Sequence, residues 1–194
     1  MSVKDYKEYS ETFTPIEIEI MPPKGKYGIF IKVDENDKLY YHIYFNDNKE
    51  EIKNKYRINK KEGMTKHEYY IKEEDKVTKI KIIIDYQIKS FKELFFRCYC
   101  IESINFKKFY RNNITNMSCM FNGCSSLEKL NLRNFNTNNV IYMSFMFYGC
   151  SSLKELNLTN FNTENVIYMR WMFSRCSSLE ELNLTNFNTS KRYG

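Results

Sequence analysis

The stretch CSSLKELNLTNFNTENVIYM, residues 150–169, decides the architecture of this chain. Near copies of it begin 26 residues earlier, at Cys124, and 26 residues later, at Cys176. The same register extends back without a gap to Cys98, which gives four units. Sequence periods of this length are typical of stacked units, none of which can bury its apolar face alone. We therefore expect a stack of four similar units that share one core.

One segment of each unit has the alternation of a β-strand. In ELNLT, Leu156 and Leu158 are predicted to point inward and the residues between them outward. Strands of successive units are then expected to pair in parallel. Four apolar positions recur in every unit and predict the core: Ile101, Leu127, Leu153 and Leu179; Ile104, Leu130, Leu156 and Leu182; Phe106, Leu132, Leu158 and Leu184; Phe109, Phe135, Phe161 and Phe187.

A second segment of the unit has helical spacing. Val140, Met143 and Phe147 fall at i, i+3 and i+7, which is one face of a short helix. Residues 137–138 are placed to cap its start and Gly149 to end it. A strand followed by a short helix in every unit predicts an α/β solenoid, with a parallel sheet on one side and short helices on the other.

The motif NMSCMFNGCSSLEKLNLRNFNTNNV, residues 116–140, resembles the 26-residue subtype of BspA-type leucine-rich repeats, which occur in surface proteins. The resemblance extends over about residues 88–189. It implies a leucine-rich-repeat solenoid that serves in adhesion and protein recognition. It carries over no catalytic residue.

The residues before the repeats predict a small antiparallel β domain. Ile16, Ile18 and Ile20 show the clearest alternation. The loops DENDK, residues 34–38, and NDNKEE, residues 46–51, are predicted to close hairpins. We therefore divide the chain into a capping domain, residues 1–80, and the repeat array, residues 81–194. The predicted strands are IEIEI (16–20), YGIFIKV (27–33), KLYYHIYF (38–45), EYYIK (68–72) and VTKIKIIID (77–85).

Cysteine and histidine patterns weaken the case for an enzyme. The four cysteines that mark the repeats form a column along the stack, whereas zinc needs sulfurs that converge on one point. Core packing is therefore favoured over disulfides or a metal site. His42 and His67 are the only histidines, and no repeat supplies a base beside its cysteine. We expect no catalytic residue, metal or cofactor, and a site in the β domain is the weakest alternative.

The charge pattern does not favour nucleic acid as a partner. The formal net charge of +6 is spread along the chain, and only KKFYR, residues 107–111, forms a basic cluster. That cluster is interpreted as a solvated loop, with phosphate binding as a minor alternative. No apolar stretch approaches the roughly 20 residues that span a bilayer. The first residues, MSVKDYKEYSETF, lack the apolar core of a signal peptide, which favours the cytoplasm, whereas the family resemblance suggests the cell surface.

Two surfaces are candidates for binding another protein. The sheet face carries the outward strand residues, and the helix face carries aromatic side chains that a regular helix would turn outward. We expect a non-enzymatic protein-binding module that uses the sheet face, with self-assembly through an open C-terminal end as the alternative. The sheet-face candidates are Lys129, Asn131, Arg133, Glu155, Asn157, Thr159, Glu181, Asn183 and Thr185; the helix-face candidates are Tyr142, Phe145, Tyr168 and Trp171.

Overall fold

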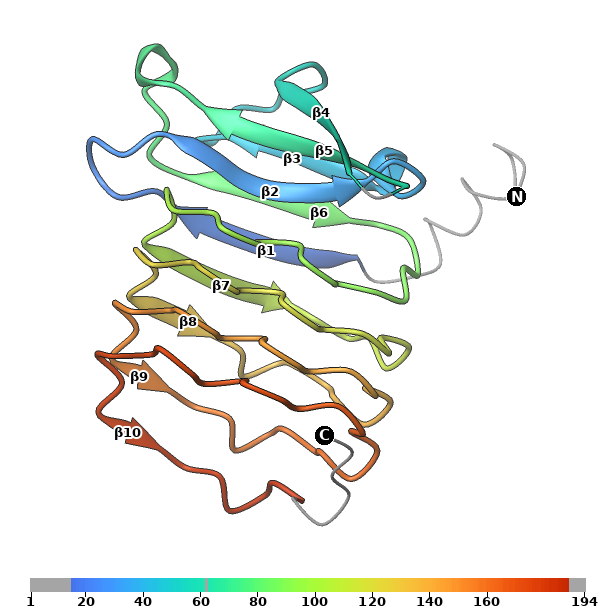
Figure 1. Cartoon of the computed structure of the whole chain (residues 1–194). Helices are drawn as coiled ribbons and strands as arrows, with labels where there is room; N and C mark the ends of the chain where they lie inside the picture. Colours follow the sequence, from blue (N-terminus) through green and yellow to red (C-terminus); the bar gives the residue numbers. More distant parts are fainter. Residues whose placement is uncertain (1–14, 62, 189–194) are drawn as a thin grey trace.

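A computed structural model describes residues 15–61 and 63–188 of this chain (Figure 1). The segment on which the signal-peptide expectation depends, residues 1–13, lies outside the described residues. The same holds for the end of the repeat array, residues 189–194.

The described part of the chain consists almost entirely of strands, turns and loops. The predicted α/β solenoid is wrong, because residues 15–61 and 63–188 contain no α-helix, and the strands fall into several sheets. The elements are β1 Ile16–Met21, β2 Gly28–Asp34, η1 Lys38–Tyr40, β3 Tyr41–Phe45, β4 Tyr56–Lys61, β5 Met64–Ile71, η2 Glu73–Asp75, β6 Ile80–Ile84, β7 Ser103–Lys108, β8 Lys129–Asn131, β9 Glu155–Leu156 and β10 Glu181–Leu182, where η marks a 3-10 helix.

The N-terminal strands form two packed layers. One layer is part of a five-stranded sheet in the order β3-β6-β1-β7-β8, and the other is the sheet β2-β5-β4. All neighbours in these sheets are antiparallel except β7 and β8, which are parallel. Phe30 from β2 and Ile18, Ile43 and Ile82 from the facing sheet are fully buried between the layers. The alternation of apolar residues thus places one face of each strand in a common core.

The two hairpins predicted in this region are wrong. The loops at 34–38 and 46–51 connect strands that belong to different sheets, because β2 pairs with β5 while β3 pairs with β6. The closest pairing of consecutive strands is β4 with β5, where Lys61 is opposite Met64. Strand β4 was not predicted, because its side chains are nearly all exposed and the apolar alternation in its sequence YRINKK is limited to Tyr56 and Ile58.

The repeats stack at the expected period of 26 residues. On the sheet side, β7 pairs in parallel with β8, and β9 with β10. On the opposite side, which we call the turn side, parallel bridges join Ser90 to Asn116, Asn116 to Tyr142, and Tyr142 to Tyr168. Stacked rings accompany them, since the centroids of Phe95, Phe121, Phe147 and Phe173 follow one another at 5.5, 5.6 and 5.7 Å.

Backbone hydrogen bonding explains why the turn side is not helical. The N–H groups of Met143, Phe145 and Phe147 donate to the next unit, at 2.7, 2.9 and 3.0 Å, whereas the Met146 N–H closes a turn within the unit on the Met143 carbonyl at 3.2 Å. Phe145 also has a left-handed backbone, with φ of 59°. A helix needs each of these N–H groups for its own carbonyls. The spacing of Val140, Met143 and Phe147 therefore marks buried positions correctly, but not a helix.

The N-terminal strands cover the first repeat on both of its sides. On the sheet side β1 pairs with β7. On the turn side the Lys32 N–H of β2 donates to the Leu94 carbonyl at 2.8 Å, and the Cys100 thiol donates to the Ile29 carbonyl at 3.0 Å. Each layer of the N-terminal part thus continues one side of the repeat stack, as Figure 1 shows.

Candidate functional site: a groove where the sheet divides

The sheet side of the repeats is interrupted between β8 and β9. Within residues 15–61 and 63–188 the five-stranded sheet ends at β8, and β9 and β10 form a sheet of their own. Most pairs of one β8 residue and one β9 residue have Cα atoms more than 8 Å apart. Hydrogen-bonded strands run about 4.8 Å apart. The two strands are therefore farther apart than the paired strands of a sheet, and no ladder joins them.

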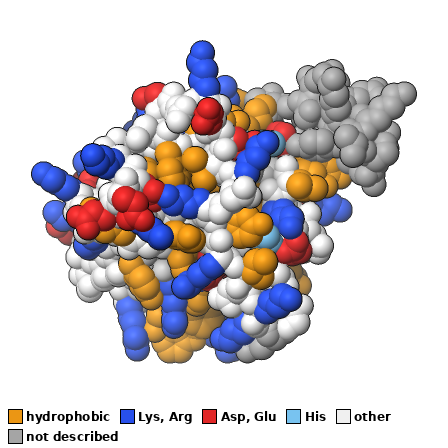
Figure 2. Space-filling model, turned by 90° about the horizontal axis from the view of Figure 1, so that it is seen from above, with side chains coloured by type: hydrophobic (Ala, Val, Ile, Leu, Met, Phe, Trp, Pro, Cys, Tyr) orange, Lys and Arg blue, Asp and Glu red, His pale blue; other side chains and the backbone are white. Residues whose placement is uncertain are grey.

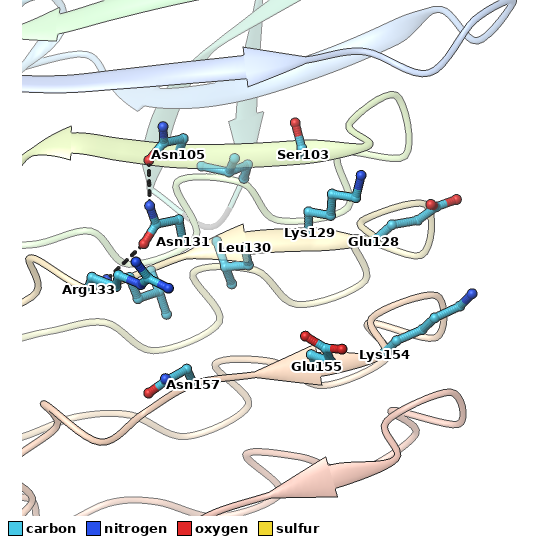
Figure 3. Close-up of a pocket in the computed structure, with 12 residues that line it drawn as sticks. Ser103, Asn105, Glu128, Lys129, Leu130, Asn131, Arg133, Lys154, Glu155 and Asn157 are labelled. Carbon is cyan, nitrogen blue, oxygen red and sulfur yellow. Dashed lines mark hydrogen bonds between the residues drawn. The ribbon is translucent and has the colours of Figure 1, made fainter.

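An open groove of about 720 Å³ occupies this interruption (Figure 3). Leu130 lies in the groove and is only half-buried, whereas its counterparts Ile104 and Leu156 are 1% and 4% exposed. The lining residues are Ser103, Ile104, Asn105, Glu128, Lys129, Leu130, Asn131, Leu132, Arg133, Lys154, Glu155 and Asn157.

Hydrogen bonds join the units on either side of the groove on the turn side and near both ends of the groove. On the turn side the N–H groups of Met143 and Phe147 donate to the Tyr168 and Met172 carbonyls, at 2.7 and 3.0 Å. At one end of the groove the Asn160 amide donates to the Leu132 and Phe135 carbonyls, at 3.0 and 2.7 Å. Near the other end the Ser152 hydroxyl donates to the Ser125 carbonyl at 2.7 Å. The opening is therefore confined to the part of the two units that contains β8 and β9.

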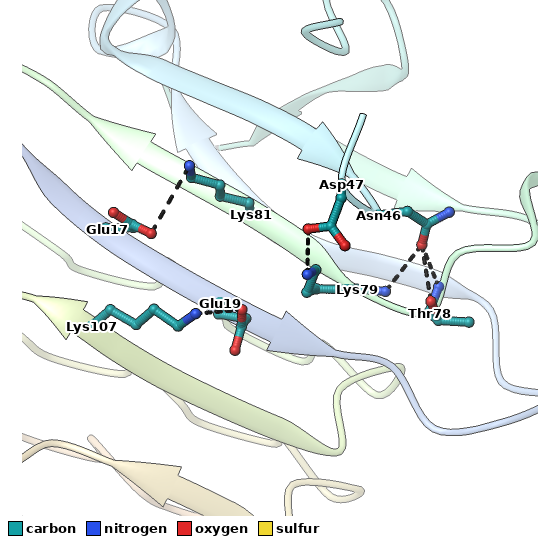
Figure 4. Close-up of polar contacts among 8 residues, drawn as sticks. All are labelled: Glu17, Glu19, Asn46, Asp47, Thr78, Lys79, Lys81 and Lys107. Carbon is teal, nitrogen blue, oxygen red and sulfur yellow. Dashed lines mark hydrogen bonds and ion pairs between the residues drawn. The ribbon is translucent and has the colours of Figure 1, made fainter. Parts of the chain in front are cut away.

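The outward charges on the neighbouring strands of the same sheet are neutralised. Glu19 on β1 pairs with Lys107 on β7 at 2.7 Å, and Glu17 pairs with Lys108 at 3.3 Å (Figure 4 shows the first pair). Arg111 is buried. The basic cluster predicted at residues 107–111 is thus divided between ion pairs and the interior, which weakens the phosphate-binding alternative.

The charges around the groove have no such partners. In the part of the chain that the structure describes, no ion pair involves Glu128, Lys129, Arg133, Lys154 or Glu155. Figure 3 places Glu128, Lys129, Lys154 and Glu155 near the beginning of the strands and Arg133 near their end. A partner that lies along the groove therefore contacts acidic and basic side chains near the beginning of the strands. Near the end of the strands it contacts the positive charge of Arg133.

All nine predicted sheet-face residues are exposed, and the groove brings five of them together. Lys129, Asn131 and Arg133 lie on one side, and Glu155 and Asn157 on the other. Asn131 also donates to Asn105 on β7 at 2.9 Å. The remaining four, Thr159, Glu181, Asn183 and Thr185, do not line the groove.

Sequence reasoning missed three contributors to the groove. Glu128 and Lys154 lie just before the strands, and Leu130 was assigned to the core. The sequence carries no signal for the opening, because Leu130 and Leu156 occupy the same repeat position.

The aromatic residues predicted on a helix face lie on the turn side instead. Tyr142 and Tyr168 are exposed and stack with their ring centroids 5.1 Å apart. Trp171 is 58% exposed, and Phe145 is half-buried against Tyr148. These side chains form a second surface on the opposite side of the stack from the groove.

The cysteines and histidines are engaged in structural contacts. The thiols of Cys124 and Cys150 donate to the carbonyls of Phe95 and Phe121, at 3.0 and 3.2 Å, and burial raises the pKa of both thiols well above the usual range. His42 contacts Glu51 and Asp85, and His67 contacts Glu35. Over residues 15–61 and 63–188 the structure contains no group of three or more potential metal ligands.

Basic side chains do not gather on the end of the molecule that carries β4 and β5. Figure 2, which views that end, shows Lys and Arg spread among acidic and hydrophobic side chains. No helix among the described residues has the length and apolar character needed to cross a bilayer.

Comparison with protein families finds one match for these repeats. Residues 89–193 match the family described as "Mycoplasma protein of unknown function, DUF285". The chain belongs to this family. Comparisons with curated proteins and with solved structures give no significant match. Family membership therefore leaves the function to be argued from the structure.

Proposed function

We propose that this protein is a non-enzymatic protein-binding module that recognises its partner through the groove on its sheet face. The observation that carries the proposal is the group of unpaired charges around a partly apolar opening. On β1 and β7 the outward carboxylates and ammonium groups neutralise one another, whereas Lys129, Arg133 and Glu155 have no ion pair. Charges of this kind are available to steer and orient a partner.

The resemblance to BspA-type repeats also favours recognition of a protein, and the side chains usual in catalysis have other roles here. Burial disfavours the thiolate form of Cys124 and Cys150, which raises the pKa of each thiol. The His42 ring lies between two carboxylates of the N-terminal part, far along the chain from the groove.

The test compares one charge on the groove with one aromatic residue on the turn side. Any partner recovered from cell extract with the immobilised wild-type chain is measured against Lys129→Glu and Trp171→Ala by isothermal titration. We expect Lys129→Glu to weaken binding about tenfold or more, with an affinity that falls as salt is added, and Trp171→Ala to bind like the wild type. Full binding by Lys129→Glu with loss in Trp171→Ala would assign recognition to the turn side instead.

Self-assembly through the C-terminal repeat is a second candidate function. Burial declines in this unit, where Leu182 and Phe187 are only half-buried and Leu184 is 37% exposed. Among residues 15–61 and 63–188, strand β10 pairs with β9 alone. An apolar position on an unpaired strand edge favours association between copies of the chain.

A further inference from the structure

We propose that the groove binds an extended polypeptide segment of the partner, which inserts as an additional strand between β8 and β9 and places an acidic side chain beside Arg133. This inference rests on the proposed function and specifies how the partner is bound.

The width of the opening is the first observation. Two strands that flank a third are separated by two strand spacings, about 9.6 Å. Most Cα pairs between β8 and β9 exceed 8 Å, and the units are joined at both ends of the groove and on the turn side. The opening is therefore wider than one strand spacing and is bounded near both ends, and the facing edges of β8 and β9 are not paired with each other.

The backbone on both sides of the opening is oriented to pair with such a chain. The Lys129 N–H donates to Glu102 of the preceding unit at 3.2 Å. Successive residues of a strand point their backbone groups to opposite sides, so the N–H and C=O of Leu130 face the groove. On the other side the Lys154 carbonyl accepts from Glu180 at 3.1 Å, which turns the backbone of Glu155 toward the groove. An inserted strand would satisfy both edges, the pairing known as β-strand addition.

The charges around the groove determine which peptide segment is preferred and how it is positioned along the groove. At the end of the groove where the strands finish, Arg133 is the charged lining residue, and Asn131 and Asn157 beside it are neutral. A guanidinium without an ion pair favours a carboxylate. An apolar side chain of the inserted segment would pack on Leu130. The preferred occupant is thus an extended segment that alternates apolar and polar residues and carries Asp or Glu near Arg133.

The experiment uses the full chain and a library of random peptides of roughly eight residues, enough for one strand. Peptides are selected on the immobilised protein, and their affinities are measured by fluorescence polarisation. Each selected peptide is then resynthesised with N-methyl groups on one alternate set of amides, and separately on the other set. An inserted strand uses one set for β8 and the other for β9, so we expect each methylated form to bind about fivefold more weakly or worse.

Two protein variants test the same pairing from the side of the groove. Leu130→Pro removes the side chain and the N–H that faces the groove, whereas Leu130→Ala removes the side chain and keeps the N–H. We expect Leu130→Pro to bind the peptides about fivefold more weakly than Leu130→Ala. Arg133→Glu should abolish the preference for acidic peptides.

The outcomes separate the two proposals. Selected peptides that lose affinity to Lys129→Glu but tolerate both sets of N-methyl groups would bind on the groove without inserting, which overturns the inference and leaves the proposed function intact. Tolerance of one set alone would indicate pairing with a single edge and also overturns insertion. A library that yields no binder sensitive to Lys129→Glu or Arg133→Glu contradicts both proposals. The methylated peptides keep the test decisive if Leu130→Pro does not fold.

Discussion

Gly123 and Gly149 occupy the same position in successive repeats, where the backbone is left-handed with φ of 74° and 69°. A Cβ at Gly149 would meet backbone atoms of Gly123 at ordinary contact distance, 3.8 Å, whereas a Cβ at Gly123 would lie 3.1 Å from Cγ of Arg97. We expect Gly149→Ala to lower the free energy of unfolding by about 1 to 2 kcal/mol through backbone strain alone. Gly123→Ala should cost more.

Urea unfolding of the two alanine variants beside the wild type measures this difference. Equal stability of all three chains would show that the turn side does not hold its left-handed positions in solution.

His42 makes stability depend on pH. The hydrogen bond with Asp85 and the charges of Asp85 and Glu51 raise the pKa of His42 above its usual 6.5. A group whose pKa is raised by folding contributes stability that is fully present below pH 6.5 and is lost as the pH rises through the raised value. We therefore expect the wild type to lose stability over that interval relative to His42→Gln. The free energy of unfolding of both proteins is measured from about pH 5.5 to about 8.5, roughly the range in which histidine titrates. If it changes with pH in the same way in both proteins, the assignment to His42 is refuted.

Single residues also show how far the sequence predicts the structure. Apart from Leu130, the columns of Ile, Leu and Phe identify buried positions correctly through the third repeat, because side chains one period apart occupy equivalent environments. The same regularity conceals the groove, since Leu130 and Leu156 share a column but only Leu156 is buried. A difference that arises from how two units stack is not recorded in either unit alone.

At the scale of elements, prediction succeeded for strands whose apolar and polar residues alternate. It failed for the turn-side segments, whose apolar residues are three or four positions apart. Alternation located β1 and β2 to within one residue at each end, whereas the strand predicted at residues 77–85 extends beyond both ends of β6. On the turn side, spacing alone did not distinguish a helix from turns whose N–H groups bond to the next unit. We therefore expect a far-ultraviolet circular dichroism spectrum without the paired minima of an α-helix. A spectrum dominated by those minima would restore the helical interpretation of the segment around Met143.

For the whole molecule, the fourth repeat differs from the others in burial. Leu184 is 37% exposed, whereas its counterparts Leu132 and Leu158 are buried. If copies of the chain associate through this end, the average mass should rise with concentration, and Leu184→Asp should suppress the rise because a charge at the contact is costly. Light scattering over a concentration series checks both. A wild type that stays monomeric throughout would eliminate self-assembly.

The interruption of the sheet between β8 and β9 is the structural basis of the proposed binding at the groove. Amide hydrogen exchange, resolved by residue with NMR, tests it most directly. In the free chain we predict that the Leu130 and Glu155 amides, which face the opening, exchange much faster than the Lys129 and Glu180 amides, which donate to neighbouring carbonyls at 3.2 and 3.1 Å. Addition of a groove-directed peptide should then slow Leu130 and Glu155 selectively. Exchange of Leu130 and Glu155 as slow as that of Lys129 in the free chain would mean that β8 and β9 are paired, and would contradict the account.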